Sequence, residues 1–503
     1  MARIKKNELI EIVKQLQDIN EQIGKQGKLI DDINLAECQE LAVKLGTYIE
    51  GAYSLSNVHD VKADNEEKEK DESITEIVHS LEAYCELIYE MSLTENQNSN
   101  KIYILTKGIK KCLFNVKRGI QDDLPVDRKQ IVFLPYKASM WDSLESIWRA
   151  ACADRSVDAY VVPIPYFDRN PDGSVAQWHY EGNDYPDYVP ITDWQKYSIP
   201  DEKPDVIFIH NPYDDCNYVT SVHPQYYSRE LKKYTKCLVY VPYFVLDGIY
   251  IGKSFTTSPA CLIADYIFCQ NENEKKIYIN DLTAIAPQKD FQNHIMPFGS
   301  PKLDKVKHIS EDNIEIPELW KERIKKDNPL LVVFYNSSVG SLLRQDGSIY
   351  FQKMIDIFND CFKANILIIW RPHPLMEATL SSMRQDYYQT YMKIKAAFIQ
   401  NDMGILDETE NVYPVMCISD AYMGDWSSII SLYAVTDKII TIIDENAQRI
   451  LFSEKEEEKD KGRVIGILKK YINKEFYKLE INYPEQKENA GSKIYSYISS
   501  KNQ

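Results

Sequence analysis

The sequence predicts an α/β protein in which two Rossmann-like domains with parallel sheets face each other across a cleft, preceded by a helical N-terminal region. Apolar runs of strand length alternate with amphipathic helical stretches over most of the chain, a pattern typical of a parallel sheet covered by helices on both faces. The alternation occurs in two series that are separated by a polar connector. At 503 residues, the chain is also too long for one ordinary core.

The helical N-terminal region is assigned to residues 1–125. Its first helix has an apolar seam with the 3-4-3-4 spacing of a heptad repeat, formed by Leu9, Ile12, Leu16, Ile19 and Ile23. Two further helical stretches cover about 35–53 and 73–91, and the charged run at 65–73 is interpreted as a solvated loop. The seam could pair with a second copy of the chain, which would form a homo-oligomer, or with other helices of the same chain.

The first α/β series covers residues 126–304. A continuous apolar strand, Ile131 to Leu134, meets a loop and then an amphipathic helix. Further buried strands are predicted within 157–167, 203–215, 236–244 and 264–271, each of which ends in a polar loop. Ligands of open parallel sheets bind beyond the carboxyl ends of the strands, so we expect functional side chains in these loops.

The second α/β series covers residues 329–503 and follows a charge-rich linker at 305–328. Its strands are predicted within 329–338, 364–374, 415–425 and 438–444. The tail after about Tyr483 is expected to be loosely ordered.

Composition excludes several classes of protein. The formal net charge of −17 argues against a nucleic-acid binder with a general basic surface, although a few local cations and helix N-termini can still hold a phosphate. The ten cysteines are scattered singly and no cluster has metal-ligand spacing, so we expect no metal and no other cofactor. Charged residues begin the chain and no apolar run approaches the length of a membrane span. We therefore expect a cytoplasmic protein whose membrane contact, if any, is peripheral and at the inner face.

Two strand ends carry the side chains of greatest interest. Arg371 and His373 alternate with two prolines directly after an apolar strand, and proline fixes the local backbone, so both side chains are held on a stiff turn. A surface turn with one salt bridge is the alternative interpretation. Arg371 could neutralise a phosphate, and His373 could donate a hydrogen bond or a proton to it.

The second strand end is Asp425 to Ser428. Asp425, Ser427 and Ser428 precede an apolar run, where a helix should begin. Ordinary helix capping explains them equally well. Alternatively, the serine hydroxyls and the free N–H groups of the first turn bind a phosphate.

These two stretches together resemble the CDP-glycerol glycerophosphotransferase family, which includes teichoic acid polymerases and primases. A strand is followed by Arg-x-His-Pro and, about fifty residues later, by a strand leading into Asp-aromatic-Ser-Ser. The stretch at 298–304 is similar to the family's Gly-x-Pro-Arg-x-Asp, with Lys302 in place of arginine, and Ser337 and Ser338 fall where the family has its first C-terminal-domain turn. The resemblance covers roughly residues 235–445.

The resemblance implies a GT-B architecture with a nucleotide-donor domain at 329–503 and an acceptor-side domain at 126–304. In the family, the two turns contact the phosphates of the donor, which implies this role for Arg371, His373, Asp425, Ser427 and Ser428. Lys302, Ser337 and Ser338 are secondary candidates.

The chain departs from the family where a base would be expected. Family members carry a His-Gly-Thr-Pro-Leu-Lys turn whose histidine is taken to activate the acceptor hydroxyl, whereas this chain has Val241, Pro242 and Tyr243. The neighbouring strand ends in His210 and Asn211, followed by Asp214. His210 is our candidate base, with Asn211, Asp214 and Tyr243 as supporting residues, although a lone histidine after an apolar run is more often structural.

The predicted function is transfer of a polyol phosphate, expected to be glycerol phosphate, from a CDP-linked donor to a hydroxyl of a cell-envelope glycopolymer or its lipid-linked precursor. Two alternatives remain open. The fold also hosts nucleotide-sugar glycosyltransferases and epimerases. A catalytically degenerate protein would keep a binding cleft and act as a scaffold, and the absent histidine turn favours this alternative.

Overall fold

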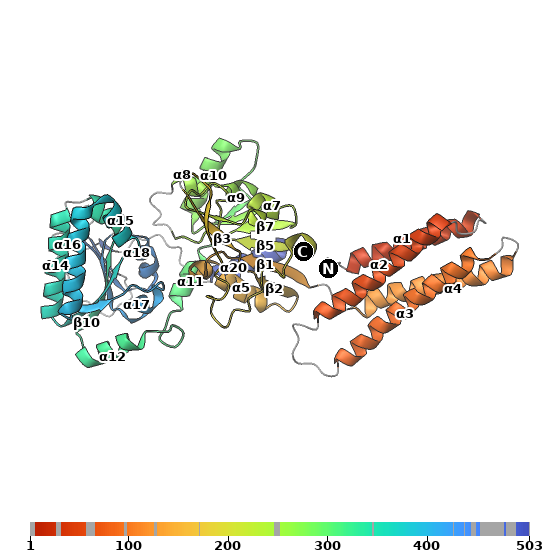
Figure 1. Cartoon of the computed structure of the whole chain (residues 1–503), viewed down its shortest axis with the longest axis horizontal. Helices are drawn as coiled ribbons and strands as arrows, with labels where there is room; N and C mark the ends of the chain where they lie inside the picture. The colour runs from red at the N-terminus through yellow and green to blue at the C-terminus, as the bar shows by residue number, and fades with distance from the viewer. Residues whose placement is uncertain are drawn as a thin grey trace. The chain divides into compact units, whose positions relative to one another are not determined.

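The structure is a computed structural model that describes residues 6–26, 32–56, 66–94, 98–124, 128–170, 172–245, 252–344, 347–425, 427–436, 438–443, 449–452, 477–478 and 489–501. Figure 1 shows a helical N-terminal region and an α/β remainder, as predicted. Within the described residues, no helix is long and apolar enough to cross a membrane.

In the described part of the N-terminal region, four long helices lie side by side (Figure 1): α1 (Lys6–Gln26), α2 (Asp32–Ser56), α3 (Glu66–Ser92) and α4 (Ser99–Asp122). Their apolar faces form one core with one another. On α1, Leu9, Val13 and Leu16 are fully buried, whereas the predicted Ile12 and Ile19 are only partly buried. The seam therefore packs within the chain and is turned slightly from the predicted one.

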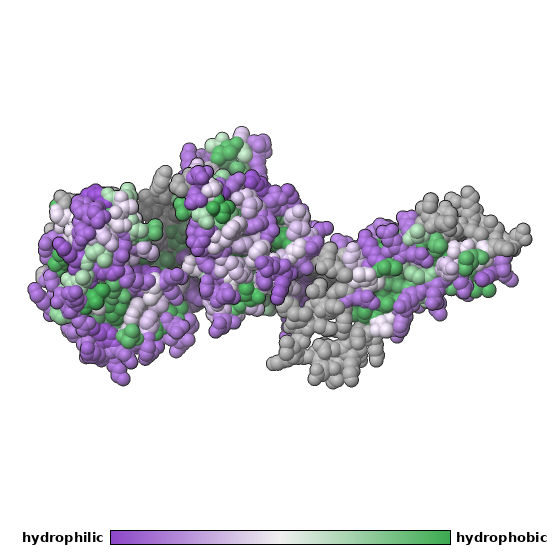
Figure 2. All heavy atoms as spheres, viewed as in Figure 1, coloured by the Kyte–Doolittle hydropathy of each residue, from purple (hydrophilic) through white to green (hydrophobic). Residues whose placement is uncertain are grey.

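The charged run at 66–73 begins α3 instead of forming a loop. Glutamate and lysine are good helix formers, so a charged segment can extend an amphipathic helix without contributing to its core. Some apolar side chains stay exposed on the bundle, including Val43, Tyr103 and Phe114, and Figure 2 shows green patches over these helices. A homo-oligomer formed through this region stays a prediction.

The first parallel sheet has the strand order β2-β1-β5-β7-β8-β9. Its strands are β1 (Lys129–Leu134), β2 (Val157–Val161), β5 (Val206–Ile209), β7 (Cys237–Tyr240), β8 (Tyr266–Phe268) and β9 (Ile295–Met296). Connecting helices and turns are η1 (Ala138–Ser143), α5 (Glu145–Cys152), α6 (Ile199–Glu202), η2 (Pro224–Tyr226), α7 (Ser228–Leu231), α8 (Lys253–Thr256), α9 (Pro259–Ile263), α10 (Glu272–Ile285) and α11 (Pro301–Lys307).

The predicted strand at 157–167 is two strands in the structure. β2 ends at Val161, and β3 (Tyr166–Arg169) joins a separate antiparallel sheet with β4 (Val175–His179) and β6 (Thr220–Val222). Pro163 and Pro165 lie between the two strands. Proline donates no hydrogen bond to a sheet, so these residues end the pairing of β2.

The second sheet has the strand order β12-β11-β10-β13-β14-β15-β16. Its strands are β10 (Leu331–Ser337), β11 (Ile366–Pro372), β12 (Gly404–Leu406), β13 (Ala421–Gly424), β14 (Ile439–Ile442), β15 (Arg449–Phe452) and β16 (Tyr477–Lys478). Connecting elements are α13 (Val339–Arg344), α14 (Gly347–Lys363), α15 (Met376–Met383), α16 (Gln385–Gln400), α17 (Tyr413–Ile418), α18 (Ser428–Tyr433) and η3 (Ala434–Thr436). The strands from β12 to β14 pair in parallel, and β15 runs antiparallel to β14.

Both faces of the second sheet are buried, which confirms the prediction from its continuous apolar strands. Alternate residues of β11 face opposite cores: Ile368 and Trp370 pack with α14 and α16, and Leu367 and Ile369 pack with α17 and α18. The predicted strand at 415–425 begins only at Ala421, because residues before it form α17.

Two segments differ from their predicted roles. The linker at 305–328 contains α12 (Glu318–Asp327), whose Trp320 packs into the core of the second domain. The described part of the C-terminal tail contains a helix, α20 (Ala490–Lys501), which packs against α5 of the first domain. Gly491 permits this contact, since a Cβ there would lie 2.2 Å from the Ser146 hydroxyl oxygen.

Candidate functional site

The carboxyl edge of the second sheet brings most of the predicted donor-site residues together. β10 lies between β11 and β13, because the chain adds β11 and β12 on one side of β10 and then β13 and β14 on the other. Open α/β sheets bind ligands at the carboxyl ends of the strands where the strand order reverses in this way. In the strand register, Asn336 of β10 lies beside both Arg371 and Gly424. The loops that carry Ser337 and Ser338, His373, and Asp425 to Ser428 therefore begin at neighbouring positions.

Gly424 allows β13 to approach β10 closely at this edge. A Cβ at Gly424 would lie 2.2 Å from the carbonyl oxygen of Asn336, a distance that no side chain can occupy. The Asp425 N–H then donates to that same carbonyl at 3.1 Å. The glycine thus fixes where the Asp425 to Ser428 loop starts.

The buried side chain of Asp425 connects three elements of the site by hydrogen bonds. Its side chain is 1% exposed, and Oδ2 accepts hydrogen bonds from the Ser338 N–H at 2.6 Å and the Tyr350 hydroxyl at 2.7 Å. These bonds tie the β13 loop to the β10 loop and to α14. The predicted contact between Asp425 and a donor phosphate does not fit this geometry, because a buried carboxylate with internal donors positions the loops and does not face a ligand.

The serines at this edge divide into two groups. Ser337 and Ser338 are buried, and their hydroxyls accept from Trp370 Nε1 at 3.0 Å and from the Ser341 N–H at 3.1 Å. Ser427 is partly buried and accepts from Asn336 Nδ2 at 3.2 Å, whereas Ser428 is exposed. Ser427 and Ser428 can therefore reach a ligand, and Ser337 and Ser338 support the loop.

Arg371 is committed to an internal ion pair. Its guanidinium lies 2.7 Å from Asp407 Oδ2, with side-chain exposures of 8% and 0%, and it also donates to the backbone oxygen of Glu410 at 3.1 Å. This is the salt-bridged turn that the sequence left open as the alternative. Arg371 thus fixes the loop after β12, and its phosphate-binding role is not supported by the geometry.

His373 faces solvent from the same edge. Its N–H donates to the Ser337 carbonyl at 2.9 Å, and its Nδ1 accepts from the Leu375 N–H at 3.1 Å. A ring that accepts at Nδ1 carries its proton on Nε2 when neutral. Desolvation lowers the pKa of His373, so at neutral pH it presents an Nε2–H donor.

The carboxyl edge of the first sheet does not offer His210 as a base. The ring is 0% exposed, Nε2 accepts from the Tyr136 N–H at 3.1 Å, and Nδ1 bonds the Ser143 hydroxyl at 3.0 Å. Burial lowers the pKa of His210 to about 3. A buried, neutral histidine whose free lone pair is already occupied cannot take a proton from a substrate.

The three residues that were predicted to support His210 have structural partners too. Asp214 is buried and accepts from both the N–H and the hydroxyl of Ser228 at 2.8 Å. Asn211 accepts from the Tyr213 N–H at 3.2 Å, and the Tyr243 hydroxyl lies 3.3 Å from that of Tyr213. These contacts shape the loops after β5 and β7 and form no proton-transfer group.

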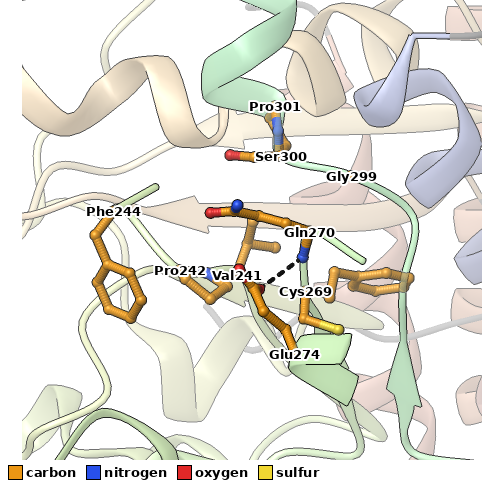
Figure 3. Close-up of a pocket in the computed structure, with 10 residues that line it drawn as sticks. Val241, Pro242, Phe244, Cys269, Gln270, Glu274, Gly299, Ser300 and Pro301 are labelled. Atoms are coloured by element: carbon orange, nitrogen blue, oxygen red, sulfur yellow. Dashed lines mark hydrogen bonds between the residues drawn. The ribbon is translucent and has the colours of Figure 1, made fainter. Parts of the chain in front are cut away.

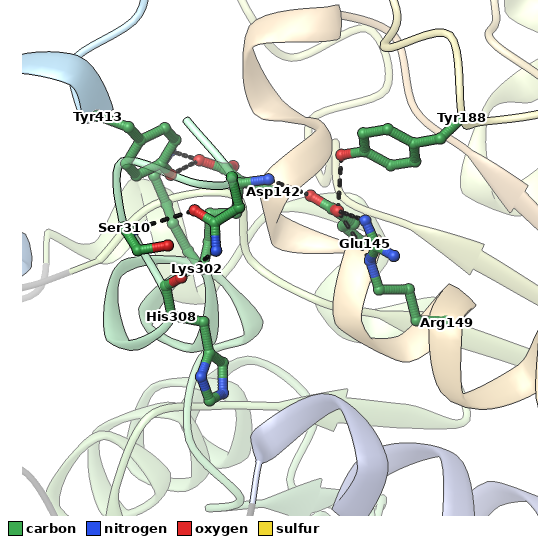
Figure 4. Close-up of polar contacts among 10 residues, drawn as sticks. Asp142, Glu145, Arg149, Tyr188, Lys302, His308, Ser310 and Tyr413 are labelled. Atoms are coloured by element: carbon green, nitrogen blue, oxygen red, sulfur yellow. Dashed lines mark hydrogen bonds and ion pairs between the residues drawn. The ribbon is translucent and has the colours of Figure 1, made fainter. Parts of the chain in front are cut away.

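Lys302 belongs to a polar network that joins the two α/β domains (Figure 4). Its Nζ lies 3.2 Å from Asp142 Oδ2, which also accepts from the Tyr413 hydroxyl of α17. Nearby, Glu145 accepts from the Tyr188 hydroxyl at 2.7 Å and pairs with Lys305 at 3.0 Å. Burial opposes ionisation of Glu145, but Lys305 and the hydrogen bonds outweigh it and lower its pKa.

A small pocket at the carboxyl ends of β7, β8 and β9 contains a residue that the sequence did not single out. Glu274 of α10 and Ser300, which precedes α11, both line it (Figure 3). The turn at Val241 and Pro242, where the resemblance would place a histidine, forms another wall. The signal for Glu274 in the sequence, Asn271 followed three residues later by glutamate, also predicts a simple helix cap.

Within the described residues, no group of three or more histidine, cysteine, aspartate or glutamate side chains could hold a metal ion.

Comparison with known proteins gives loose structural similarity. No protein-family model and no curated protein sequence matches the chain. The UDP-GlcNAc 2-epimerase from Methanocaldococcus jannaschii in complex with UDP-GlcNAc and UDP is similar, at 13% identity and a TM-score of 0.42 over 74% of this chain and 99% of that one. The UDP-GlcNAc 2-epimerase from Neisseria meningitidis bound to UDP-GlcNAc is 12% identical, with a TM-score of 0.40. The match covers 74% of this chain and 100% of that one. A variant of the wall teichoic acid polymerase TagF is 13% identical, with a TM-score of 0.36. The match covers 69% of this chain and 77% of that one. Similarity of this degree assigns no activity to the chain.

Proposed function

We propose that the protein transfers a polyol phosphate, and specifically glycerol phosphate, from a CDP-linked donor to a hydroxyl of a cell-envelope glycopolymer or its lipid-linked precursor. The observation that carries the proposal is the meeting of His373, Ser427 and Ser428 at the carboxyl edge of β10, β11 and β13. The residues of the two strand ends that resemble the CDP-glycerol glycerophosphotransferase family lie at this edge.

The proposed chemistry is attack of the acceptor oxygen on the β-phosphorus, with CMP as the leaving group. Negative charge grows on the phosphoryl oxygens and on the departing phosphate, so catalysis depends on donors placed around them. His373 Nε2–H and the hydroxyls of Ser427 and Ser428 are the proposed donors. Arg371 and Asp425 hold the loops that present them.

The proposed partners are a CDP-polyol donor and a glycopolymer acceptor. A lipid-linked acceptor would bring the protein to the inner face of the cell membrane as a peripheral, cytoplasmic enzyme. The proposal requires no resident cofactor, because the pyrophosphate bond of the donor supplies the driving force.

Donor protection tests this proposal. CDP-glycerol should raise the melting temperature of the full-length protein, and UDP-GlcNAc at the same concentration should not. His373→Ala should abolish this protection, since it removes the Nε2–H donor, and His79→Ala, an exposed site in the helical region, should leave it unchanged. Protection by UDP-GlcNAc alone would instead favour a nucleotide-sugar transferase or epimerase.

The scaffold alternative keeps one observation in its favour. His210, the candidate base, is buried and neutral, so it cannot activate the acceptor. A degenerate protein would bind CDP-glycerol without releasing CMP.

A further inference from the structure

We propose that Glu274 and Ser300 form the subsite for the acceptor hydroxyl, and that the Glu274 carboxylate takes the proton from that hydroxyl during transfer. The role applies to the reaction proposed above and depends on it. It gives the first α/β domain a catalytic residue in place of His210.

Both side chains are buried, and each has an oxygen without a hydrogen-bond partner among the residues that the structure describes. Glu274 is 3% exposed, and its Oε2 accepts from the Gln270 N–H at 2.9 Å, whereas Oε1 has no partner in the described part of the chain. Ser300 is 4% exposed, and no described residue bonds its hydroxyl. Leaving a buried polar group unsatisfied is unfavourable, because the group loses its hydrogen bonds to water without replacement. These two oxygens can both bond a hydroxyl group that enters the pocket, whether it belongs to a water molecule or to an acceptor (Figure 3).

The chemistry of the pocket selects an uncharged hydroxyl. A hydroxyl can donate to Glu274 and accept from Ser300 at the same time, whereas a phosphate would be repelled by the carboxylate. Val241, Pro242 and Phe244 provide the apolar wall, and the pocket has room for about one water-sized group, so it admits a terminal hydroxyl and not the rest of the acceptor. The ligand class is therefore the free hydroxyl end of a polyol or glycan.

The helix that follows the pocket, α11, packs against α18, which begins at the proposed donor site. α11 begins directly after Ser300, and its Leu303 and Val306 belong to the same core cluster as Ile430 of α18. α18 in turn begins directly after Ser427. α11 has seven residues, which makes it about 10 Å long. One short helix thus lies between the proposed acceptor subsite and the helix that starts at Ser427.

The proposed step balances without a further reactant. The acceptor O–H bond breaks and its proton moves to Glu274, while the acceptor oxygen forms a bond to the β-phosphorus. The bond between that phosphorus and the oxygen of CMP breaks, and CMP leaves with the electron pair. Glu274 then returns its proton to solvent.

Protonation of the pocket supports a base that works near neutral pH. Burial raises the pKa of Glu274 to about 7, close to the value at which a general base is most effective. The titratable neighbours that interact with Glu274 are Cys269 at the end of β8 and Tyr278 on α10, and burial raises the pKa of both, so both stay neutral. The turn after β7 and the start of α11 contribute no titratable side chain to the pocket lining.

The pH profile of acceptor-dependent CMP release from CDP-glycerol tests the proposal, with a crude envelope acceptor. For the wild type, kcat/KM should fall about tenfold per pH unit below an apparent pKa near 7. Glu274→Gln should lower kcat by about 100-fold or more, which is the usual contribution of a general base, with the KM for CDP-glycerol within about threefold. Glutamine still offers an oxygen to the Gln270 N–H. The control is Glu272→Gln, an exposed position in the same helical turn, which should match the wild type.

Each outcome separates this proposal from the proposed function. If the wild type turns over and the kcat of Glu274→Gln is within about threefold of the wild-type kcat, the role of Glu274 is overturned and the transfer function stands. A wild-type pH profile that is flat between about pH 5.5 and 8 has the same consequence. Binding of CDP-glycerol without any acceptor-dependent release overturns both. If Glu274→Gln fails to fold, the wild-type pH profile and the Ser300→Ala variant provide the test. Ser300→Ala should raise the KM for the acceptor about tenfold and keep the pH dependence of the wild type. An unchanged KM for the acceptor contradicts the subsite.

Discussion

Arg371 and Asp407 form an ion pair in which both side chains are buried. Removing one partner of a buried pair leaves an uncompensated charge, which costs about 3–5 kcal/mol. We expect Arg371→Ala to lower the free energy of unfolding by about this amount in chemical denaturation. Lys321→Ala, which removes an exposed pair with Glu318, is the control and should cost less than about 1 kcal/mol. An equally small cost for Arg371→Ala would argue that this arginine is kept for a ligand instead.

Glu274 gives the folded protein a pH dependence that Glu274→Gln should remove. Burial raises its pKa from 4.5 to about 7, so the folded state binds a proton in this range that the unfolded state has already lost. The contribution of Glu274 to stability is therefore present below pH 4.5 and is lost as the pH rises to about 7. The pKa difference of about 2.5 pH units corresponds to about 3 kcal/mol.

The measurement is denaturant unfolding of wild type and Glu274→Gln at several pH values between about 4.5 and 7.5. The stability of the wild type relative to the variant should decline by about 3 kcal/mol over this range. A constant difference would show that Glu274 ionises at its ordinary pKa and is not desolvated.

Sequence reasoning at this scale found which residues gather, but not how they are used. His373, Ser427 and Ser428 were placed at a common edge because strand ends are visible in the sequence. Arg371 pairs with Asp407, which lies 36 residues away in the sequence. His210 bonds Ser143, which lies 67 residues away. Nothing in a local pattern distinguishes such a partner from a ligand. Glu274 has no functional signal in the sequence, because Asn271 followed three residues later by glutamate is typical of an ordinary helix cap.

α20 is held by Asp304 of α11. The two carboxylate oxygens accept from the first N–H groups of the helix, those of Ala490 and Gly491, each at 2.9 Å. The helix itself packs on α5. Asp304→Ala would leave these N–H groups without a partner, so we expect a loss of about 1–3 kcal/mol and faster amide hydrogen exchange throughout α20.

Hydrogen exchange followed by mass spectrometry checks this prediction on the full-length protein. Asp312→Ala, at an exposed position beyond α11, should leave the exchange of α20 unchanged. Unaltered protection of α20 in Asp304→Ala would mean that packing on α5 holds the helix without the cap.

Elements were predicted well where the apolar pattern is long and poorly where it is short. β10 and β11 are continuous apolar runs and were located correctly. β12 has three residues, all only partly buried, and gave no signal. The prediction of a loop for the charged start of α3 is wrong. The segment has no apolar residue at helical spacing, so periodicity gave no sign of a helix, although glutamate and lysine favour helices.

At the scale of the whole molecule, the alternation of strands and helices was enough to predict two parallel sheets after a helical region, and the structure has this organisation. The return of the C-terminal helix to the first domain was not predictable. It depends on the bond between Asp304 and Ala490, 186 residues apart, and on the absence of a side chain at Gly491. The same limit applies to the network of Asp142, Lys302 and Tyr413, whose members come from both α/β domains.

Release of CMP from CDP-glycerol, with and without a crude envelope acceptor, tests the central claim most directly. The proposed transfer predicts acceptor-dependent release by the wild type. His373→Ala should lose most of this release, because His373 supplies an Nε2–H donor to the phosphates, whereas His210→Ala should affect stability more than the chemistry of the folded protein. Measurable CDP-glycerol binding with no release of CMP, whichever acceptor is present, would contradict the account and leave a cleft that binds without catalysing.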